Sequence, residues 1–223
     1  PEKAKFLAGF FKTGKGEYAE KDIFLGISVP EQRKIAFKYL SLQPSDLKDL
    51  LSSPVHEHRF TALEILVAKY ERGTDEIKKK IFDFYLKNKK YVNNWDLVDT
   101  SAEYILGDNL FGKNKNILYK LAGSKNIWER RIAIITTFNF IKRGRFADTL
   151  KIAEILIKDN HDLIQKAVGW MLREIGKRDL KTEEKFLNKH HKNMPRTMLR
   201  YAIERFKEPK RIFYLKGFNI KIS

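Results

Sequence analysis

The stretch 163-LIQKAVGWMLREIGK-177 decides the fold class of this chain. Its apolar residues lie three or four positions apart, the spacing of one face of an α-helix: Leu163, Ala167, Trp170 and Met171. Gly176 at the end of this stretch, and Gly107 at the end of an earlier one, are typical helix stops. Sustained two-residue alternation with hairpin signals occurs nowhere, so the sequence predicts an all-α fold.

A small or apolar residue recurs in the middle of five helical stretches, at Ala62, Leu97, Ala133, Ala167 and Ala202. The steps between these positions are 35, 36, 34 and 35 residues. A period of this length with two helices in each repeat is typical of an α-solenoid. We therefore expect stacked antiparallel helix pairs of the HEAT-like or ARM-like kind. The alternative is a regular helical bundle in which the spacing is coincidental.

The chain is strongly basic. Its 223 residues include 45 Lys and Arg against 28 Asp and Glu, which gives a formal net charge of +17. Most of the excess lies in two blocks, residues 112–145 and 181–223. In one solenoid domain spanning residues 1–223, these blocks would line a concave basic face and bind a polyanion. A solvated lysine-rich face is the alternative for each block alone.

Several kinds of site are excluded or disfavoured by the sequence. The absence of cysteine excludes disulfides, thiolate nucleophiles and iron–sulfur clusters, and fits a reducing cytoplasm. No apolar run approaches the ~20 residues of a membrane span, and no signal peptide is visible. The pairs His56/His58 and His190/His191 lack a third ligand and are expected at the surface. We therefore expect no metal, no cofactor and no membrane contact.

The segment 94-NWDLVD-99 carries the most informative side chains. Trp95 and Asp99 are four residues apart and so share one face of a helix, which Asn94 or Asn93 would cap. A carboxylate beside an indole on a basic surface points to a reactive or binding site. The alternative is that Trp95 belongs to the core and that Asp96 or Asp99 only favours the N-terminus of the helix through its charge.

The other two tryptophans also stand beside arginines. Trp170 is three residues before Arg173, and Trp128 precedes Arg130 and Arg131. Arginine pairs with phosphate and a flat indole can cover sugar or base, so this combination suits a nucleic-acid backbone. For Trp128 the core is the alternative, because an apolar stripe continues from it along the helix.

These segments together resemble the HEAT-like-repeat DNA glycosylases, the AlkD-type DNA alkylation repair enzymes, over nearly the whole chain. The resemblance rests on five stretches in matching order and spacing: Phe24–Arg33, Asn94–Asp99, Trp128–Ala133, Gln165–Glu174 and Met194–Glu204. It implies hydrolysis of the N-glycosidic bond of cationic N3- and N7-alkylated purines in duplex DNA. It also implies that no base-flipping pocket is needed, in contrast to most enzymes that act on a base.

The resemblance implies a role for each candidate residue. Asp99 would be the catalytic carboxylate, with Trp95 and Trp170 against the deoxyribose of the lesion. The DNA-binding positions would be Arg131, Arg173, Arg130, Ser28 and Arg200. Ser28 stands where the best-known members carry a longer polar side chain. We expect a cytoplasmic, nucleoid-associated monomer of bacterial or archaeal type. The alternative function is a non-catalytic helical-repeat module that binds nucleic acid or an acidic protein.

Overall fold

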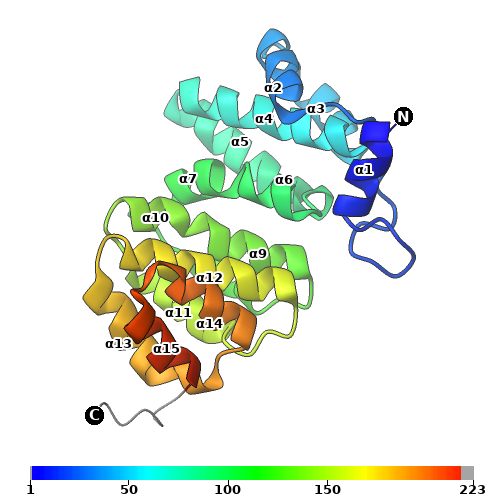
Figure 1. Ribbon diagram of the computed structural model, residues 1–223. Coiled ribbons are helices and arrows are strands. Elements are labelled where there is room, and N and C mark those ends of the chain that lie inside the picture. Colours follow the sequence, from blue (N-terminus) through cyan, green and yellow to red (C-terminus); the bar gives the residue numbers. More distant parts are fainter. Residues whose placement is uncertain (1, 217–223) are drawn as a thin grey trace, which may run out of the picture. The chain divides into compact units, whose positions relative to one another are not determined.

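The protein is all-helical, as the sequence predicts. The computed structural model describes residues 2–216, so the end of the second basic block, residues 217–223, lies outside the described residues. Within the described part there is no strand, and Ile23 and Val55 form one isolated parallel bridge. No helix of this part is long and apolar enough to cross a bilayer. Contacts divide the chain into two compact units, Pro1–Asn109 and Leu110–Ser223 (Figure 1).

The first unit is organised around α4. Its elements are α1 (Glu2–Phe10), α2 (Val29–Lys38), α3 (Pro44–Ser52), α4 (His56–Arg72), α5 (Asp75–Asn88), the short η1 (Lys89–Tyr91), α6 (Trp95–Asp99), the π-helix η2 (Glu103–Gly107) and the start of α7 (Asp108–Leu110). Helices α2, α3, α5 and α6 all contact α4. Because α4 is covered on several sides, its middle residues Ala62, Leu63 and Ile65 are fully buried.

The second unit is organised around α12. Its elements are α8 (Asn116–Ala122), α9 (Ile127–Thr136), α10 (Phe138–Lys142), α11 (Ala147–Ile155), α12 (Asp162–Gly176), α13 (Leu180–His190), η3 (His191–Asn193), α14 (Arg196–Ala202), η4 (Ile203–Arg205) and α15 (Glu208–Lys216). Helix α12 packs most closely on α14. Gly169 makes this possible, because a Cβ there would collide with the backbone oxygen of Met198 and the side chain of Tyr201.

The five positions that set the sequence period share one structural role. Ala62, Leu97, Ala133, Ala167 and Ala202 lie in α4, α6, α9, α12 and α14, and each is at most 1% exposed. Helix α12 ends at Gly176, as predicted. The predicted stop at Gly107 is wrong. This glycine closes the π-helix η2, and the chain continues directly into α7 because the neighbouring residues remain helical.

Candidate active site

Helix α6 presents the predicted pair Trp95 and Asp99. The Asn94 side chain accepts a hydrogen bond from the Trp95 amide at 2.8 Å, which confirms Asn94 as the cap and places Trp95 in the first turn. Leu97 and Val98 are fully buried on the opposite side of the helix. Trp95 and Asp99, four residues apart on the helix, are each half-buried.

The Trp95 indole sits in an aromatic cluster contributed by the end of α1. Phe11 stacks on it with ring centroids 5.2 Å apart and an interplanar angle of 12°. Phe10 approaches it edge-on at 6.0 Å. Such contacts each stabilise an aromatic pair by roughly 0.5–1.5 kcal/mol beyond simple burial. The indole is thus held in one orientation while part of its surface stays exposed.

Asp99, at the end of α6, acts electrostatically on the buried Tyr85 phenol. Burial raises the pKa of Tyr85 well above its usual range, and the negative charge of Asp99 raises it further. Tyr85 itself shares a hydrogen bond of 3.1 Å with the Ser101 hydroxyl. A carboxylate in this setting can accept hydrogen bonds from water and stabilise a cationic group in contact with it.

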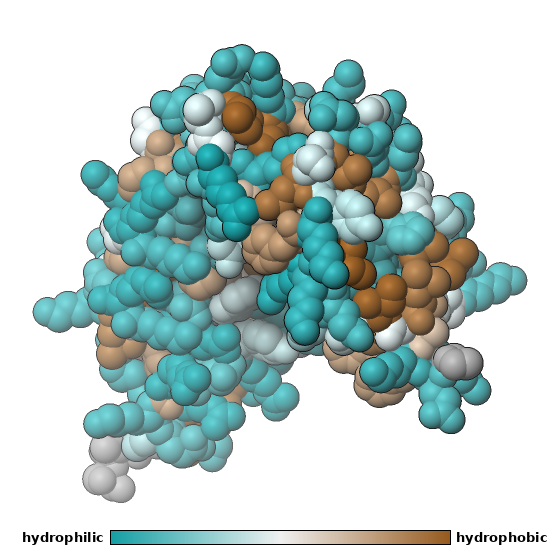
Figure 2. All heavy atoms as spheres, turned by 90° about the horizontal axis from the view of Figure 1, so that it is seen from above, coloured by the Kyte–Doolittle hydropathy of each residue, from teal (hydrophilic) through white to brown (hydrophobic). Residues whose placement is uncertain are grey.

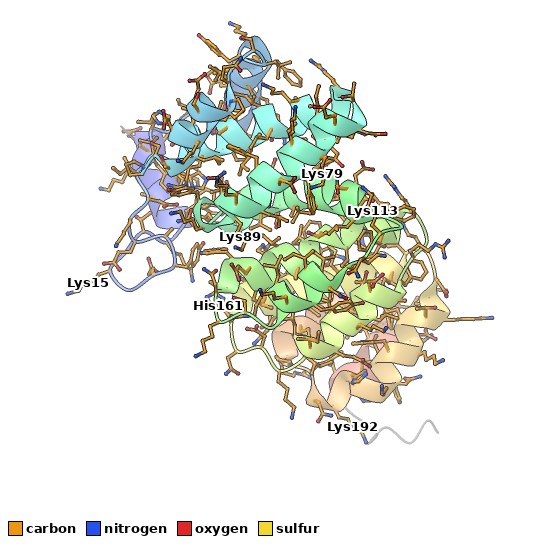
Figure 3. The ribbon with its side chains drawn as sticks, turned by 180° about the vertical axis from the view of Figure 1, so that it is seen from behind. Lys15, Lys79, Lys89, Lys113, His161 and Lys192 are labelled. Carbon is orange, nitrogen blue, oxygen red and sulfur yellow. The ribbon has the colours of Figure 1, made fainter. Side chains whose placement is uncertain are left out.

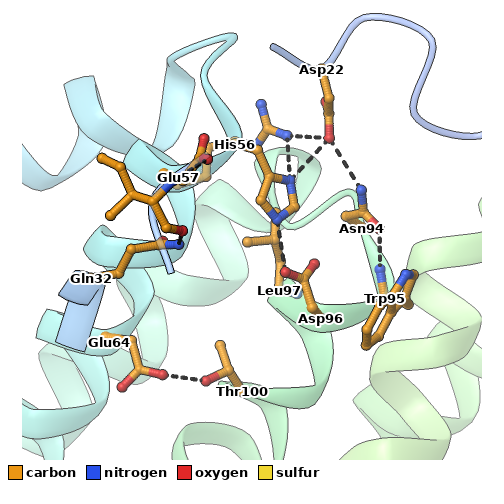
Figure 4. A network of polar contacts seen from close by, with 12 residues as sticks. Asp22, Gln32, His56, Glu57, Glu64, Asn94, Trp95, Asp96, Leu97 and Thr100 are labelled. Carbon is orange, nitrogen blue, oxygen red and sulfur yellow. Dashed lines mark hydrogen bonds and ion pairs between the residues drawn. The ribbon is translucent and has the colours of Figure 1, made fainter. Parts of the chain in front are cut away.

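A buried polar network lies beside Trp95 and is linked to it through Asn94 (Figure 4). Its centre is the His56 ring, whose Nε2 is 2.7 Å from Asp96 Oδ2 and whose Nδ1 is 3.2 Å from Asp22 Oδ2. The same Asp22 oxygen pairs with Arg59 Nη2 at 2.6 Å and accepts a hydrogen bond from Asn94 Nδ2 at 3.2 Å. Two separate segments of the first unit, the loop at Asp22 and helix α4, are thereby tied to the start of α6.

The charges of this network compensate one another. Burial acts to lower the pKa of His56, but its hydrogen bonds to Asp22 and Asp96 outweigh burial and raise that pKa above its usual value. Burial acts to raise the pKa of Asp22, and the hydrogen bond from His56 together with the Arg59 charge holds it below its usual value. The network therefore favours two cations facing two carboxylates, the arrangement that buried ions require.

The network corrects the expectation that His56 lies at the surface. The His56 residue is only 3% exposed, because Phe24 stacks on one side of its ring at 4.6 Å and Phe11 lies 4.9 Å away. His191 is buried as well, so surface positions for both histidine pairs are wrong in part. Within residues 2–216 no group of three His, Cys, Asp or Glu side chains could hold a metal ion.

A small pocket of about 240 Å³ opens beside the network, between α1 and the segment that leads into α2. Phe6, Phe11 and Phe24 supply much of its lining. Two of its carboxylates are already committed: Glu57 accepts from the backbone amides of residues 25–27, and Asp96 accepts from His56 and from the Leu97 amide. Gln32 donates to the Ile27 carbonyl at 2.8 Å, whereas its buried Oε1 has no hydrogen-bond partner among the described residues.

The second unit holds Trp170 on α12. Its indole is half-buried, lies against Phe138 at a centroid distance of 5.6 Å, and donates from Nε1 to Glu174 Oε1 at 3.3 Å. Burial acts to raise the pKa of Glu174, but the hydrogen bond and charge of Lys177 hold it below its usual value. A charged acceptor thus fixes the Trp170 ring.

Three of the candidate arginines of the second unit are engaged within the protein. Arg173 pairs with Glu204. Arg130 pairs with Asp159 at 2.6 Å and donates to two backbone carbonyls of the preceding loop, both at 3.0 Å. Arg131 is 5% exposed and donates to the Leu163 carbonyl at 2.6 Å. These side chains therefore order the segments around α9 and α12, a structural role that the sequence did not indicate.

Three further residues from the sequence analysis have clear positions. Trp128 is 8% exposed, which confirms that it belongs to the core. Arg200 is exposed on α14. Ser28 caps α2 through a capping box, in which its hydroxyl and amide both donate to Glu31, at 2.5 and 3.0 Å.

Comparison with known proteins agrees with this architecture. None of the curated proteins compared is significantly similar to the chain. A solved structure described as a predicted DNA alkylation repair enzyme from Enterococcus faecalis shares the fold, with a TM-score of 0.72 and 17% sequence identity, over 93% of this chain and 96% of that one. The family model of the DNA alkylation repair enzymes matches residues 1–206. The chain therefore belongs to the DNA alkylation repair enzyme family.

Proposed function

We propose that this protein is a DNA glycosylase that hydrolyses the N-glycosidic bond of cationic N3- or N7-alkylated purines in duplex DNA, without a base-flipping pocket. The observation that carries the proposal is the half-buried pair on α6, Asp99 and the aromatic-bound Trp95. Membership of the DNA alkylation repair enzyme family indicates DNA as the substrate. The Asp99 carboxylate can stabilise the positive charge that develops on the sugar of an alkylated purine nucleotide as the base departs.

The chemistry requires few protein groups. An alkylated purine already carries a positive charge, so it departs with the electron pair of the glycosidic bond without protonation by a general acid. Positive charge then develops at the sugar C1′, where the Asp99 carboxylate would stabilise it. A water molecule adds to C1′ and its proton passes to Asp99 or to solvent. The products are the free base and an abasic site.

The remaining candidate residues complete the proposal by family resemblance. Trp95 and Trp170 would cover the deoxyribose of the lesion. Arg131 would bind a phosphate near it. Arg130, Arg173, Arg200 and Ser28 would contact DNA more peripherally.

Architecture and setting belong to the same proposal. The equal spacing and common burial of the five repeat positions support an α-solenoid, and the basic blocks support a concave DNA-binding face. We propose that both units form one functional domain, that the protein acts as a monomer, and that it works on chromosomal DNA in the cytoplasm.

The decisive experiment incubates the protein with duplex DNA that contains a single 7-methylguanine, followed by alkali cleavage of the abasic product. We expect strand scission above the spontaneous rate, and a loss on the order of 10²-fold or more in Asp99→Asn. Asp83→Asn is the matched control, because Asp83 is an exposed carboxylate of the same unit that pairs only with Lys79 among the contacts found for it. It should retain the wild-type rate.

Scission at the spontaneous rate with wild-type protein, or equal rates for wild type and Asp99→Asn, would refute the glycosylase proposal. Retained affinity for duplex DNA in that case would instead favour the non-catalytic DNA-binding module. Affinity that does not change with salt would favour an acidic protein as the partner, because phosphate contacts release counterions and make binding salt-dependent.

A further inference from the structure

Helix α1 exposes two phenylalanines that the core does not use. Phe6 is 71% exposed and Phe10 is 56% exposed, and no residue of α1 is buried. Their rings stack with centroids 6.3 Å apart and an interplanar angle of 14°. We call Phe6 and Phe10 the α1 aromatic pair. Figure 2, which looks onto the first unit, shows hydrophobic side chains gathered in patches between charged ones. Exposed aromatic pairs of this kind mark contact sites.

The α1 aromatic pair is continuous with the candidate active site. Phe10 contacts the Trp95 indole edge-on at 6.0 Å, so Phe6, Phe10 and Trp95 form one aromatic series that runs from solvent to α6. Any molecule that covers Trp95 from the solvent side also meets this helix. The pair is therefore an extension of the same binding surface within the first unit.

The helix that carries the pair is anchored. Phe11 follows α1 directly and is buried between Trp95 and Phe24, with centroid distances of 5.2 and 4.9 Å. The first turn of α1 packs on Gly26, where a Cβ would lie 2.8 Å from the Ala4 nitrogen. Because both ends of α1 are fixed, the exposed rings form a preorganised surface, which lowers the entropic cost of binding.

Exposed lysines around the pair outnumber the one exposed acid of α1, Glu2. Lys3, Lys5 and Lys12 are exposed on or beside α1. Lys15 lies on the following loop, and Figure 3 shows its side chain directed away from the protein. Proteins that bind unpaired nucleotides combine aromatic rings, on which the bases stack, with basic side chains, which bind the phosphates. A purely apolar protein partner would gain nothing from these lysines.

We propose that the α1 aromatic pair is a stacking site for the nucleobase of an unpaired nucleotide that neighbours the nucleotide held at Trp95. This inference rests on the proposed function for the identity of the polymer, and it adds a second nucleotide contact to the surface. A nucleobase stacks on Phe6 or Phe10, and the lysines of α1 bind the adjoining phosphates. The contact is independent of base sequence, because every base has a flat π-face.

The test uses unalkylated duplex DNA with one bulged 2-aminopurine and the same duplex fully paired. Affinities are measured by anisotropy and stacking by 2-aminopurine fluorescence, for wild type, Phe6→Leu/Phe10→Leu and Phe37→Leu. Phe37 is the matched control, since it is 55% exposed on α2 of the same unit. We expect the wild type to bind the bulged duplex roughly 10-fold more tightly than the paired one and to quench its fluorescence. The double variant should lose both effects, and Phe37→Leu should keep both.

An unchanged preference for the bulge in the double variant would overturn the proposal. So would an equal loss of affinity for both duplexes, or equal effects of the Phe37→Leu change. Self-association of the wild type that disappears in the double variant, with DNA preference unaltered, would assign the pair to contact between protein copies instead. No alkylated base or bond cleavage enters the measurement, so its outcome is separate from that of the glycosylase assay.

Discussion

Two buried carboxyl groups, one in each unit of this protein, are held in opposite ways. In the first unit, Asp22, His56 and Arg59 are almost completely buried but are partners of one another. In the second unit, the Glu183 residue on α13 is 1% exposed, and its Oε1 finds no hydrogen-bond partner among the described residues. Gly176 is pressed so closely against this carboxyl that a Cβ there would overlap it.

The difference separates a site that holds ions from one that holds a neutral acid. In the first unit, pairing with His56 and Arg59 lets the carboxylates of the network stay charged. The network in turn fixes the helix that bears Trp95 and Asp99. Burial raises the pKa of Glu183 to about 8, with the neighbouring Glu184 charge adding to the effect. The first arrangement holds the helix of the candidate active site in place. The second makes the unfolding free energy of the second unit depend on pH.

The largest expected effect is the removal of Asp22. In Asp22→Ala the buried Arg59 guanidinium loses its carboxylate and the His56 imidazole keeps only Asp96, which costs roughly 3–5 kcal/mol of unfolding free energy. Hydrogen exchange read by mass spectrometry should show the loss of protection in α4 and α6. Asp49→Ala, on the exposed side of α3, should change stability by about 0.5 kcal/mol or less.

A uniform loss of protection that is equally strong in α12 and α14 would contradict this assignment, because the network lies entirely within the first unit. Equal effects of Asp22→Ala and Asp49→Ala would show that the buried pairing contributes little.

A smaller effect is expected at Glu183 and should depend on pH. The folded-state pKa of this carboxyl, about 8, exceeds its unfolded value of about 4.5, so the folded protein binds more protons between these values. Stability of the second unit should therefore fall as pH rises from 5 to 9. Glu183→Gln keeps the shape without the ionisation, and at pH 9 it should exceed the wild type by on the order of 2 kcal/mol.

Denaturant titrations at pH 5, 7 and 9, combined with hydrogen exchange of α13, check this expectation. At pH 5 the two proteins should differ by about 0.5 kcal/mol or less, because Glu183 is then protonated in the folded state. A parallel pH dependence of wild type and Glu183→Gln would mean that another group titrates.

The contrast between the units also shows which structural features can be predicted from sequence patterns. Helix periodicity placed Ala62, Ala133 and Ala167 at buried positions, and the cap rules placed Asn94 correctly, because these signals are local. The buried network was not predictable. Asp22 and His56 are 34 residues apart and meet only through the tertiary fold. Pairing of Arg130 with Asp159 escaped prediction for the same reason, since a charge pattern does not distinguish a phosphate from an internal carboxylate.

Among the surface charges, Arg200 and Arg130 should separate binding from folding. Arg200 is exposed, so Arg200→Ala should weaken binding to undamaged duplex roughly 2- to 5-fold, whatever the sequence. It should also reduce the slope of log affinity against log salt concentration by about 1.

Arg130→Ala should instead destabilise the second unit by about 1–2 kcal/mol, because it removes the pair with the largely buried Asp159. Anisotropy titrations between about 50 and 200 mM salt, paired with melting curves, distinguish the two. Reversed outcomes would move Arg130 into the DNA interface.

The smallest effect is expected at Ser28, where a DNA contact and a capping role make different predictions. The hydroxyl is already engaged with Glu31 in the capping box of α2, so Ser28→Ala should lower stability by about 1 kcal/mol. The DNA affinity of Ser28→Ala should stay within about 2-fold of wild type, since a neutral hydroxyl contributes little to counterion release.

Ser28→Asp keeps an N-cap acceptor but adds negative charge near Glu31. If Ser28 only caps the helix, Ser28→Asp therefore affects stability more than binding. If it touches phosphate, the added charge repels the backbone and the affinity falls further than in Ser28→Ala.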